Sequence, residues 1–170
     1  INMNSFEKFK NQKLSYFYKR SNLICYLVIV LIFWLDRISK IKIIDQQNNG
    51  LIYINDYINL DLTWNTGIGF GLLSESSNFF YNTITGLIGF VIVVLVNLIL
   101  KAKLIDKIIY SFIVGGAVGN FYDRFVYASV PDFIDIHYKN FHWFTFNIAD
   151  IFISFGIIML IGIDLILKKK

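Results

Sequence analysis

Four long apolar segments divide this chain of 170 residues, and they restrict what it can fold into. They cover about residues 22–41, 79–100, 105–122 and 147–167. About 20 mostly apolar residues form a helix that crosses the hydrocarbon core of a bilayer. Only 16% of the residues are charged, compared with about 25% in soluble domains. We therefore predict an all-α membrane protein with four transmembrane helices, built as a single domain over residues 22–167.

Lysine and arginine residues cluster beside these segments and predict their orientation. The clusters lie in an N-terminal arm (residues 1–21), in the loop near residues 101–107, and in a C-terminal tail (residues 168–170). Basic residues next to membrane spans stay on the cytoplasmic side, so both termini are expected in the cytoplasm. The net charge of +4 is then a topology signal. Nucleic-acid binding would need basic residues on one folded face with stacking aromatics, and we do not expect it.

An alternating pattern marks the first outer loop. Between Ile52 and Trp64, almost every even-numbered residue is apolar, whereas the odd-numbered residues are polar or tyrosine. A period of two is typical of a strand or hairpin with one apolar face. We therefore predict a small extracytoplasmic β-sheet subdomain over about residues 51–65, resting on the outer membrane surface.

Glycines follow this loop and recur in the third apolar segment. Gly67, Gly69 and Gly71 lack the helix and the lysine of a phosphate-binding loop, so they predict a close backbone approach to another group. Gly115 and Gly119 form a GxxxG pair, which predicts tight packing between helices.

Aspartates at the outer ends of the last two apolar segments are the candidate catalytic groups. Asn120 precedes Asp123 by three residues and Asn147 precedes Asp150 by three, so each pair shares a helix face. Asp132 is expected in the second outer loop, at the same membrane face. An acid at membrane depth costs about 2.5–3.5 kcal/mol, which favours a functional role. Neighbouring carboxylates can share a proton and activate water, so the sequence predicts a membrane enzyme that uses carboxylates.

Other interpretations of these acids remain open at this point. Asp123 and Arg124 suit a structural cap and ion pair at the end of a helix, and Asp132 and Asp135 suit solvated loop acids. Asp123, Asp132 and Asp135 also suit Mg²⁺ in a phosphotransferase acting on lipid head groups. A proton-coupled carrier with Asp150 as relay is a third possibility, although the chain shows no inverted repeat.

Two histidines in the second outer loop are the candidate metal ligands of the sequence. His137 and His142 lie close to Asp132 and Asp135 in the sequence, but no compact HxxxH or CxxC spacing supports a metal centre. We therefore expect neither a metal nor a cofactor.

At the level of motifs, the chain resembles the bacterial lipoprotein signal peptidases, the type II signal peptidases of aspartyl peptidase family A8. The resemblance extends over roughly residues 22–167 and rests on five blocks in the same order, at residues 35–40, 64–70, 115–124, 130–133 and 146–150. It implies an enzyme of the bacterial cytoplasmic (inner) membrane with its active site near the outer face. Such an enzyme removes the signal peptide of diacylglyceryl-modified prolipoproteins, cutting just before the lipidated cysteine.

The resemblance also implies roles for particular residues. Asp132 and Asp150 correspond to the catalytic pair. The implied supporting and substrate-binding residues are Asp36, Lys40, Asn65, Gly67, Asn120, Asp123, Arg124 and Asn147. The implied partners are prolipoproteins and membrane phospholipid, and globomycin is expected to inhibit. The chain departs from the usual motifs at Arg37, where glutamine is usual, and at Pro131, which removes a backbone N–H beside Asp132.

Overall fold

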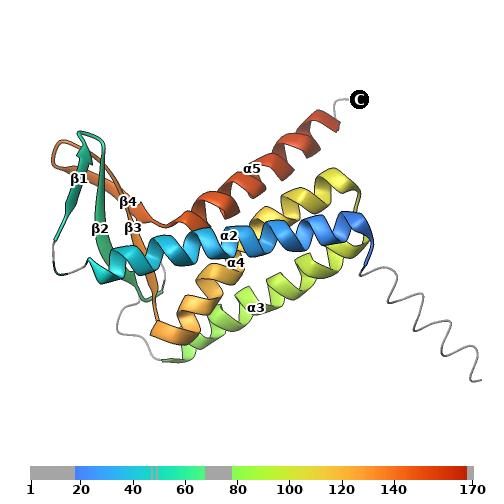
Figure 1. The fold of residues 1–170 in the computed structure, drawn as a ribbon, viewed down its shortest axis with the longest axis horizontal. Helices are drawn as coiled ribbons and strands as arrows, with labels where there is room; N and C mark the ends of the chain where they lie inside the picture. The colour runs from blue at the N-terminus through green and yellow to red at the C-terminus, as the bar shows by residue number, and fades with distance from the viewer. Residues whose placement is uncertain (1–17, 47, 49, 68–77, 168–170) are drawn as a thin grey trace, which may run out of the picture.

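In the computed structural model, which describes residues 18–46, 48, 50–67 and 78–167, long helices pack side by side and a β-sheet lies at one end of them (Figure 1). The helices are α2 (Arg20–Asp45), α3 (Asn78–Lys101), α4 (Leu104–Tyr127) and α5 (Ile148–Leu167). Most of the predicted basic arm, the C-terminal tail and the glycines at positions 69 and 71 lie outside the described residues. Each helix contains most of one of the four apolar segments, so the predicted helical architecture is confirmed.

Three of the described helices are long and apolar enough to cross a membrane. These stretches are Tyr81–Lys101, Leu104–Tyr127 and Ile148–Ile166. The 26 residues of α2 are sufficient in length, but its C-terminal half carries Asp36, Arg37 and Lys40. A transmembrane position for α2, and with it the arrangement of four spans, therefore stays a prediction.

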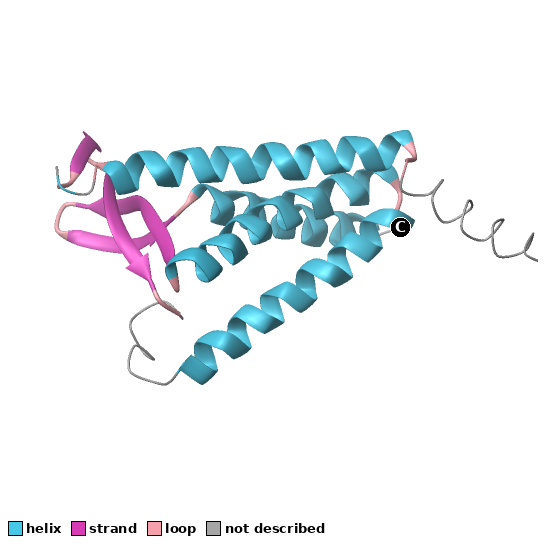
Figure 2. Cartoon of the chain, turned by 60° about the horizontal axis from the view of Figure 1, so that its bottom comes forward, coloured by secondary structure: helices cyan, strands magenta, loops and turns pink. Residues whose placement is uncertain are grey.

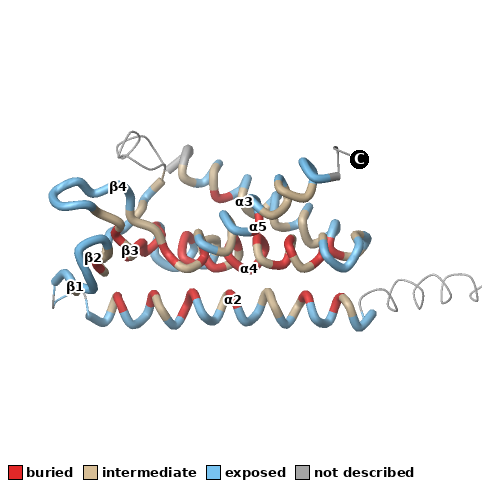
Figure 3. The backbone as a smooth tube through the Cα atoms, turned by 90° about the horizontal axis from the view of Figure 1, so that it is seen from above, coloured by how far each residue is buried: buried red, intermediate tan, exposed pale blue. Residues whose placement is uncertain are grey.

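Helix α4 is the central helix of the bundle. It packs against α2, α3 and α5, and it carries many of the buried residues (Figure 3). Glycine makes this close packing possible: a Cβ added to Gly115 would lie 2.8 Å from Cβ of Ile32 on α2. The predicted role of the GxxxG pair in helix packing is confirmed at this position.

Four antiparallel strands form the sheet in the order β1-β2-β3-β4 (Figure 2). The strands are β1 (Ile52–Asn55), β2 (Ile58–Asn65), β3 (Val130–Tyr138) and β4 (Phe141–Phe146). The hairpin predicted over residues 51–65 is confirmed as β1 and β2. No strand was predicted in the connection between the third and fourth helices, which forms β3 and β4. Proline and acidic residues interrupt the apolar alternation of β3, which forms because it pairs with β2 on one side and β4 on the other.

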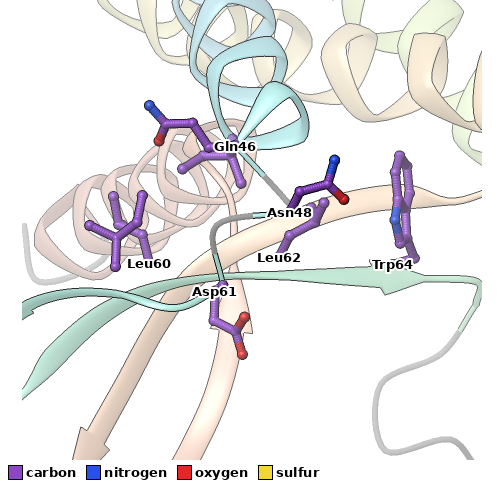
Figure 4. A pocket seen from close by; sticks show the side chains of 9 residues that line it. Gln46, Asn48, Leu60, Asp61, Leu62 and Trp64 are labelled. Carbon is purple, nitrogen blue, oxygen red and sulfur yellow. The ribbon is translucent and has the colours of Figure 1, made fainter.

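The apolar side of β2 faces the end of α2. Leu60, Leu62 and Trp64 point toward Gln46, whereas Asp61 points away from the helix (Figure 4). These side chains line a pocket of about 350 Å³. The alternation seen in the sequence therefore separates the two sides of this strand.

Candidate active site

The first turn of α5 holds Asp150 in a fixed position. Asn147 precedes the helix, and its Oδ1 accepts a hydrogen bond of 3.0 Å from the backbone N–H of Asp150. In return, Asp150 Oδ2 accepts a hydrogen bond of 3.1 Å from the backbone N–H of Asn147. This reciprocal arrangement is a capping box, formed here by an asparagine and an aspartate. It places the Asp150 carboxylate at the N-terminal end of α5, where the helix dipole favours negative charge.

Asp132 lies on β3, where two amides donate to its carboxylate. Asn65 Nδ2, at the end of β2, donates to Oδ2 at 2.9 Å, and Asn147 Nδ2 donates to Oδ1 at 2.6 Å. The residue is only 4% exposed. Asp132 lies in the predicted connection between the third and fourth helices, where it is part of β3. The alternative of a solvated acid is wrong, because the pairing of β2 with β3 buries this carboxylate.

Asn147 connects the two candidate catalytic carboxylates. Its side-chain amide donates to Asp132, and its backbone N–H donates to Asp150. Asp150 Oδ1 also accepts a hydrogen bond of 2.8 Å from Asn120 Nδ2 on α4. The structure thus brings Asp132 and Asp150 into one hydrogen-bonded cluster, although one lies on a strand and the other on a helix.

Burial is the largest cause that raises the pKa of Asp132 to about 6. The hydrogen bond from Asn65 lowers this pKa, the charge of Asp150 raises it, and the hydrogen bond from Asn147 lowers it. An ordinary aspartate has a pKa of about 3.9, so Asp132 keeps its proton over a range in which most aspartates have lost theirs. Two carboxyl groups that share one proton near neutral pH can provide both the acid and the base of a reaction.

A buried lysine, Lys40, orients the cluster from the side of α2. Its Nζ donates to Asp36 Oδ2 at 2.7 Å, to Asn120 Oδ1 at 2.8 Å and to Asp123 Oδ2 at 2.6 Å. An ammonium has three N–H donors, so each one is used. Because Lys40 holds the Asn120 oxygen, the Asn120 nitrogen is free to donate to Asp150. Asp36 and Lys40 are one helical turn apart on α2 and form an ion pair.

Asp36 links α2 to the start of α5. Its Oδ1 accepts a hydrogen bond of 2.9 Å from the backbone N–H of Ala149, which lies in the first turn of α5. The first N–H groups of a helix lack partners within the helix, so this carboxylate satisfies one of them. Gly119 provides the space, since a Cβ added there would lie 2.6 Å from Asp36 Oδ2.

Arg37 belongs to this network, and sequence reasoning recorded it only as a departure from the usual motif. Its Nη1 lies 2.5 Å from Asp123 Oδ1, and its Nη2 donates to the Tyr127 hydroxyl at 3.1 Å. Asp36 and Asp123 together carry two negative charges, and Lys40 and Arg37 supply two positive ones. The requirement that a charge at membrane depth be paired was the signal that could have identified Arg37.

The predicted end of the third helix at Tyr122 is wrong, because α4 continues to Tyr127. Asp123 therefore lies inside the helix, where its ion-pair partners are Arg37 and Lys40. The alternative of a local ion pair between Asp123 and Arg124 is also wrong. Consecutive helical residues point in different directions, and the Arg124 guanidinium lies 5.3 Å from the centre of the Tyr81 ring on α3.

Arg124 lines a cavity of about 440 Å³ between α3 and α4. Thr85, Phe121 and Phe125 are among its other lining residues. Within the described part of the chain, Nε and Nη1 of Arg124 are buried and have no hydrogen-bond partner. Buried guanidinium N–H groups without acceptors are costly, so this cavity is suited to a polar group of a bound molecule.

Gly67 follows the strand end that carries Asn65. Its backbone N–H donates to Asn65 Oδ1 at 3.1 Å, which forms a tight turn and leaves Asn65 Nδ2 directed at Asp132. Among the described residues, no atom lies within 4 Å of a Cβ added to Gly67. The predicted close approach of another group to this glycine therefore stays a prediction.

The structure does not form the magnesium site that the three acids suggested. Asp132 and Asp135 are three residues apart on β3, so their side chains point to opposite faces of the sheet. Asp123 is already paired with two cations. Where the structure describes the chain, the residues with metal-ligand spacing are Asp135, His137 and His142.

Comparison with known proteins adds evidence that is independent of this geometry. The family model described as signal peptidase (SPase) II matches residues 28–166. A lipoprotein signal peptidase of Pelagibacter ubique (strain HTCC1062) is 45% identical over 147 residues, which are 85% of this chain and 89% of the relative. A lipoprotein signal peptidase of Rickettsia conorii (strain ATCC VR-613 / Malish 7) is 39% identical over 151 residues, 85% of this chain and 72% of the relative.

Solved structures show the same similarity. A bacterial membrane enzyme determined by the in meso method at 2.3 Å resolution aligns with a TM-score of 0.71 and 28% identity, over 86% of this chain and 90% of its own. Another, at 1.9 Å resolution, aligns with a TM-score of 0.71 and 27% identity, over 84% of this chain and 92% of its own.

Proposed function

The chain belongs to the signal peptidase II family, the lipoprotein signal peptidases, and we propose that Asp132 and Asp150 are the catalytic pair with which it cuts prolipoproteins. As a member of this family, it is a membrane peptidase that removes signal peptides from prolipoproteins. We propose further that it cuts just before a cysteine that carries diacylglycerol.

The hydrogen bonding of Asn147 is the observation that carries the proposal. One residue donates to both carboxylates, through its side chain to Asp132 and through its backbone to Asp150. Since Asn65 and Asn120 each add one more donor, neither side chain is free to turn away. Two positioned carboxylates, one of which has its pKa raised to about 6, can provide the acid and the base of a mechanism that acts on a water molecule.

In the proposed mechanism, Asp132 holds the shared proton and Asp150 is ionised. Asp150 takes a proton from water while the water oxygen forms a bond to the scissile carbonyl carbon, and the Asp132 proton polarises the carbonyl oxygen. The tetrahedral intermediate then collapses, the C–N bond breaks, and Asp150 returns its proton to the leaving amine. Water is consumed, the two carboxyl groups regain their starting states, and the step requires no metal.

The remaining polar residues keep this pair in place. Asp36, Lys40 and Asp123 form a buried network that directs Asn120 toward Asp150. Arg124 has a different role in our proposal: it meets a polar group of the lipidated substrate in the cavity between α3 and α4, where its Nε and Nη1 have no partner among the described residues.

We also propose the membrane arrangement that the basic clusters predict. All four helices cross the inner membrane, both termini lie in the cytoplasm, and the sheet lies at the outer face. The active site is then near the outer surface, where a prolipoprotein with its lipid in the membrane can reach it. Globomycin-type inhibitors are expected to compete with this substrate, and the surrounding phospholipid is expected to contact the exposed apolar side chains of the helices.

The test is cleavage of a diacylglyceryl-modified prolipoprotein by the purified chain in detergent. We expect EDTA to leave cleavage in place at a temperature well below unfolding, and globomycin to block it. Asp132→Asn and Asp150→Asn are each expected to lower kcat by about a thousandfold or more, because removing one member of a catalytic unit removes most of its effect. Both variants should still insert in the membrane.

Asp61→Asn is the matched control, since Asp61 is an exposed acid on β2 that points away from α2. Its activity should equal that of the unaltered chain. Full activity in Asp132→Asn or in Asp150→Asn would refute the proposed pair, whereas loss of cleavage in EDTA with the fold intact would favour a metal-dependent reaction.

A further inference from the structure

A second cluster of chemically active side chains lies on the sheet, apart from the proposed catalytic pair. Asp135 and His137 are on β3, and His142 is on β4. One possible ligand atom from each residue lies within 4.8 Å of the other two. Because Asp132 and Asp135 are an odd number of positions apart on one strand, the cluster is on the opposite face of the sheet from Asp132.

Strand pairing explains why these residues meet. His142 is the register partner of His137, and Asp135 is two residues from His137 on the same face. The register shifts between Ile136 and His137, where β4 contains one extra residue. A bulge of this kind redirects side chains, and here it brings the His142 ring to the Asp135 carboxylate.

The distances within the cluster suit a small metal ion. Asp135 Oδ2 lies 2.8 Å from His142 Nδ1 and 3.6 Å from His137 Nδ1. Bonds of about 2.0–2.1 Å to a tetrahedral zinc ion place neighbouring ligand atoms about 3.3–3.4 Å apart. The three ligand atoms all lie within 4.8 Å of one another, and rotations of the side chains would be needed to bring them to bonding distance of one ion. Two imidazoles and one carboxylate favour zinc and similar transition metals, and they disfavour Mg²⁺ and Ca²⁺, which prefer oxygen ligands.

A fourth residue supports the inference independently. Asn59 on β2 is the register partner of Asp135 and is only 7% exposed. Its Nδ2 lies 3.4 Å from His137 Nδ1, while its Oδ1 has no hydrogen-bond partner among the described residues. A buried oxygen without a donor calls for an explanation. A half-turn of the Asn59 amide, which exchanges Oδ1 and Nδ2, would direct this oxygen to a cation bound at His137 Nδ1.

The cluster combines two buried side chains with one exposed side chain, as a metal-binding site does. The side chains of Asp135 and His137 are 6% and 9% exposed, whereas that of His142 is 56% exposed. Buried ligands keep water from competing for the ion, and an exposed ligand leaves a path for it to enter.

We propose that Asp135, His137 and His142 bind one divalent transition-metal ion of the zinc class, with Asn59 contributing its side-chain oxygen. The ion joins β4 to β3 and β2 and so stabilises the sheet that carries Asp132. Its role is structural, and the inference does not depend on the proposed catalytic pair.

Zinc binding by the full chain in detergent tests this proposal. The protein carries an affinity tag without histidine, is stripped with EDTA and is then titrated with Zn²⁺ by calorimetry. We expect one saturable site per chain, no competition from Mg²⁺, and a higher Tm with Zn²⁺ present, because an ion that binds only the folded state stabilises it.

Variants locate the ion. His142→Gln alters a side chain that is 56% exposed, so the fold should persist, and we expect the affinity for Zn²⁺ to fall about tenfold or more. The double variant His137→Gln with His142→Gln should lose both the binding and the gain in Tm. Asp61→Asn, in the same sheet, should retain them, and so should the double variant Asp132→Asn with Asp150→Asn.

Two results would overturn the proposal. The first is the absence of saturable Zn²⁺ binding, or binding that the double histidine variant leaves unchanged, since the hydrogen bond between His142 and Asp135 would then be sufficient to explain the cluster. The second is loss of binding in the variant that lacks both proposed catalytic aspartates, which would place the ion at that pair.

Discussion

At the scale of single residues, each carboxylate oxygen of Asp132 and Asp150 accepts a hydrogen bond from its own donor. Asn65 and Asn147 donate to the two oxygens of Asp132, and Asn120 and the Asn147 backbone donate to those of Asp150. Donors to a carboxylate lower its pKa, whereas burial raises it. The balance favours burial at Asp132, whose pKa is raised to about 6.

The pH dependence of cleavage follows from this value. In the proposed mechanism Asp132 must be protonated, so we expect kcat/KM to fall as the pH rises through about 6. The measurement is kcat/KM on a lipidated substrate between about pH 5 and pH 8. A profile without a descending limb in this range would contradict the assignment of the proton to Asp132.

The raised pKa of Asp132 also makes the free energy of unfolding depend on pH. The folded chain holds the Asp132 proton up to about pH 6, whereas the unfolded chain releases it near pH 3.9. Between these values the folded state binds more protons, so the contribution of Asp132 to the free energy of unfolding falls as the pH rises.

Asn147 has two functions that a pair of variants can separate. Asn147→Ala removes both the helix cap and the donor to Asp132, so we expect a loss of about 1 kcal/mol in stability and a lower kcat. Asn147→Ser keeps a capping oxygen, but its shorter side chain lacks the amide that donates to Asp132, so stability should remain while kcat still falls. Loss of this donor should also raise the Asp132 pKa, because the Asn147 hydrogen bond lowers it.

The pH profile distinguishes positioning from a purely structural role for Asn147. We expect the descending limb of kcat/KM to move to higher pH in Asn147→Ser. An unchanged profile with normal kcat in this variant would show that Asn147 acts only as a helix cap.

At the scale of helices and strands, close contacts of α4 position the network. Gly119 faces Asp36 on α2, and Gly116 faces Ala149 on α5. Asp36 on α2 accepts a hydrogen bond from the first turn of α5. This contact is possible because Gly119 on α4 has no side chain that would hold the two helices apart. Three helices therefore meet at the depth of the proposed catalytic pair.

Gly119→Ala tests this contact. Its Cβ would lie 2.6 Å from Asp36 Oδ2, so Asp36 or α4 must move, and we expect a lower Tm and reduced cleavage. Gly162→Ala on α5 is the control, since no described atom lies within 4 Å of a Cβ there. Alanine favours helix over glycine by up to about 1 kcal/mol, so the control should be neutral or slightly stabilising. Equal Tm values for both variants would contradict the close contact.

At the scale of the whole molecule, the sheet lies at one end of the bundle and the loop between α3 and α4 lies at the other (Figure 1). The proposed topology places the sheet outside and this loop in the cytoplasm. Lys139, in the turn between β3 and β4, and Lys103, between α3 and α4, are both exposed. They are therefore suitable probe positions for the two sides of the membrane.

Cysteine labelling can check this orientation. Cys25 is the only cysteine in the sequence and is replaced by alanine first. A membrane-impermeant maleimide should then label Lys139→Cys on intact cells, and should label Lys103→Cys only after the membrane is permeabilised. Labelling of Lys103→Cys on intact cells would contradict the proposed topology.

Local patterns in the sequence determined the helices, the first hairpin and the residues to consider as catalytic. Length and hydropathy identify a helix, and alternation identifies β1 and β2, because both depend on neighbouring residues in the chain. The motif resemblance singled out Asp132 and Asp150 without any distance between them. The resemblance also included Asn147 as a supporting residue. It did not reveal that Asn147 donates a hydrogen bond to both carboxylates.

Only the tertiary structure decided which distant residues meet. β3 and β4 form because they pair with β2 and with each other, and no alternation in their own sequence predicts them. Arg37 compensates the charge of Asp123, which is 86 positions away. The cluster of Asp135, His137 and His142 depends on the register of two strands and on a bulge. Contacts of this kind depend on how separate segments pack, and a pattern that is read along one segment does not contain that information.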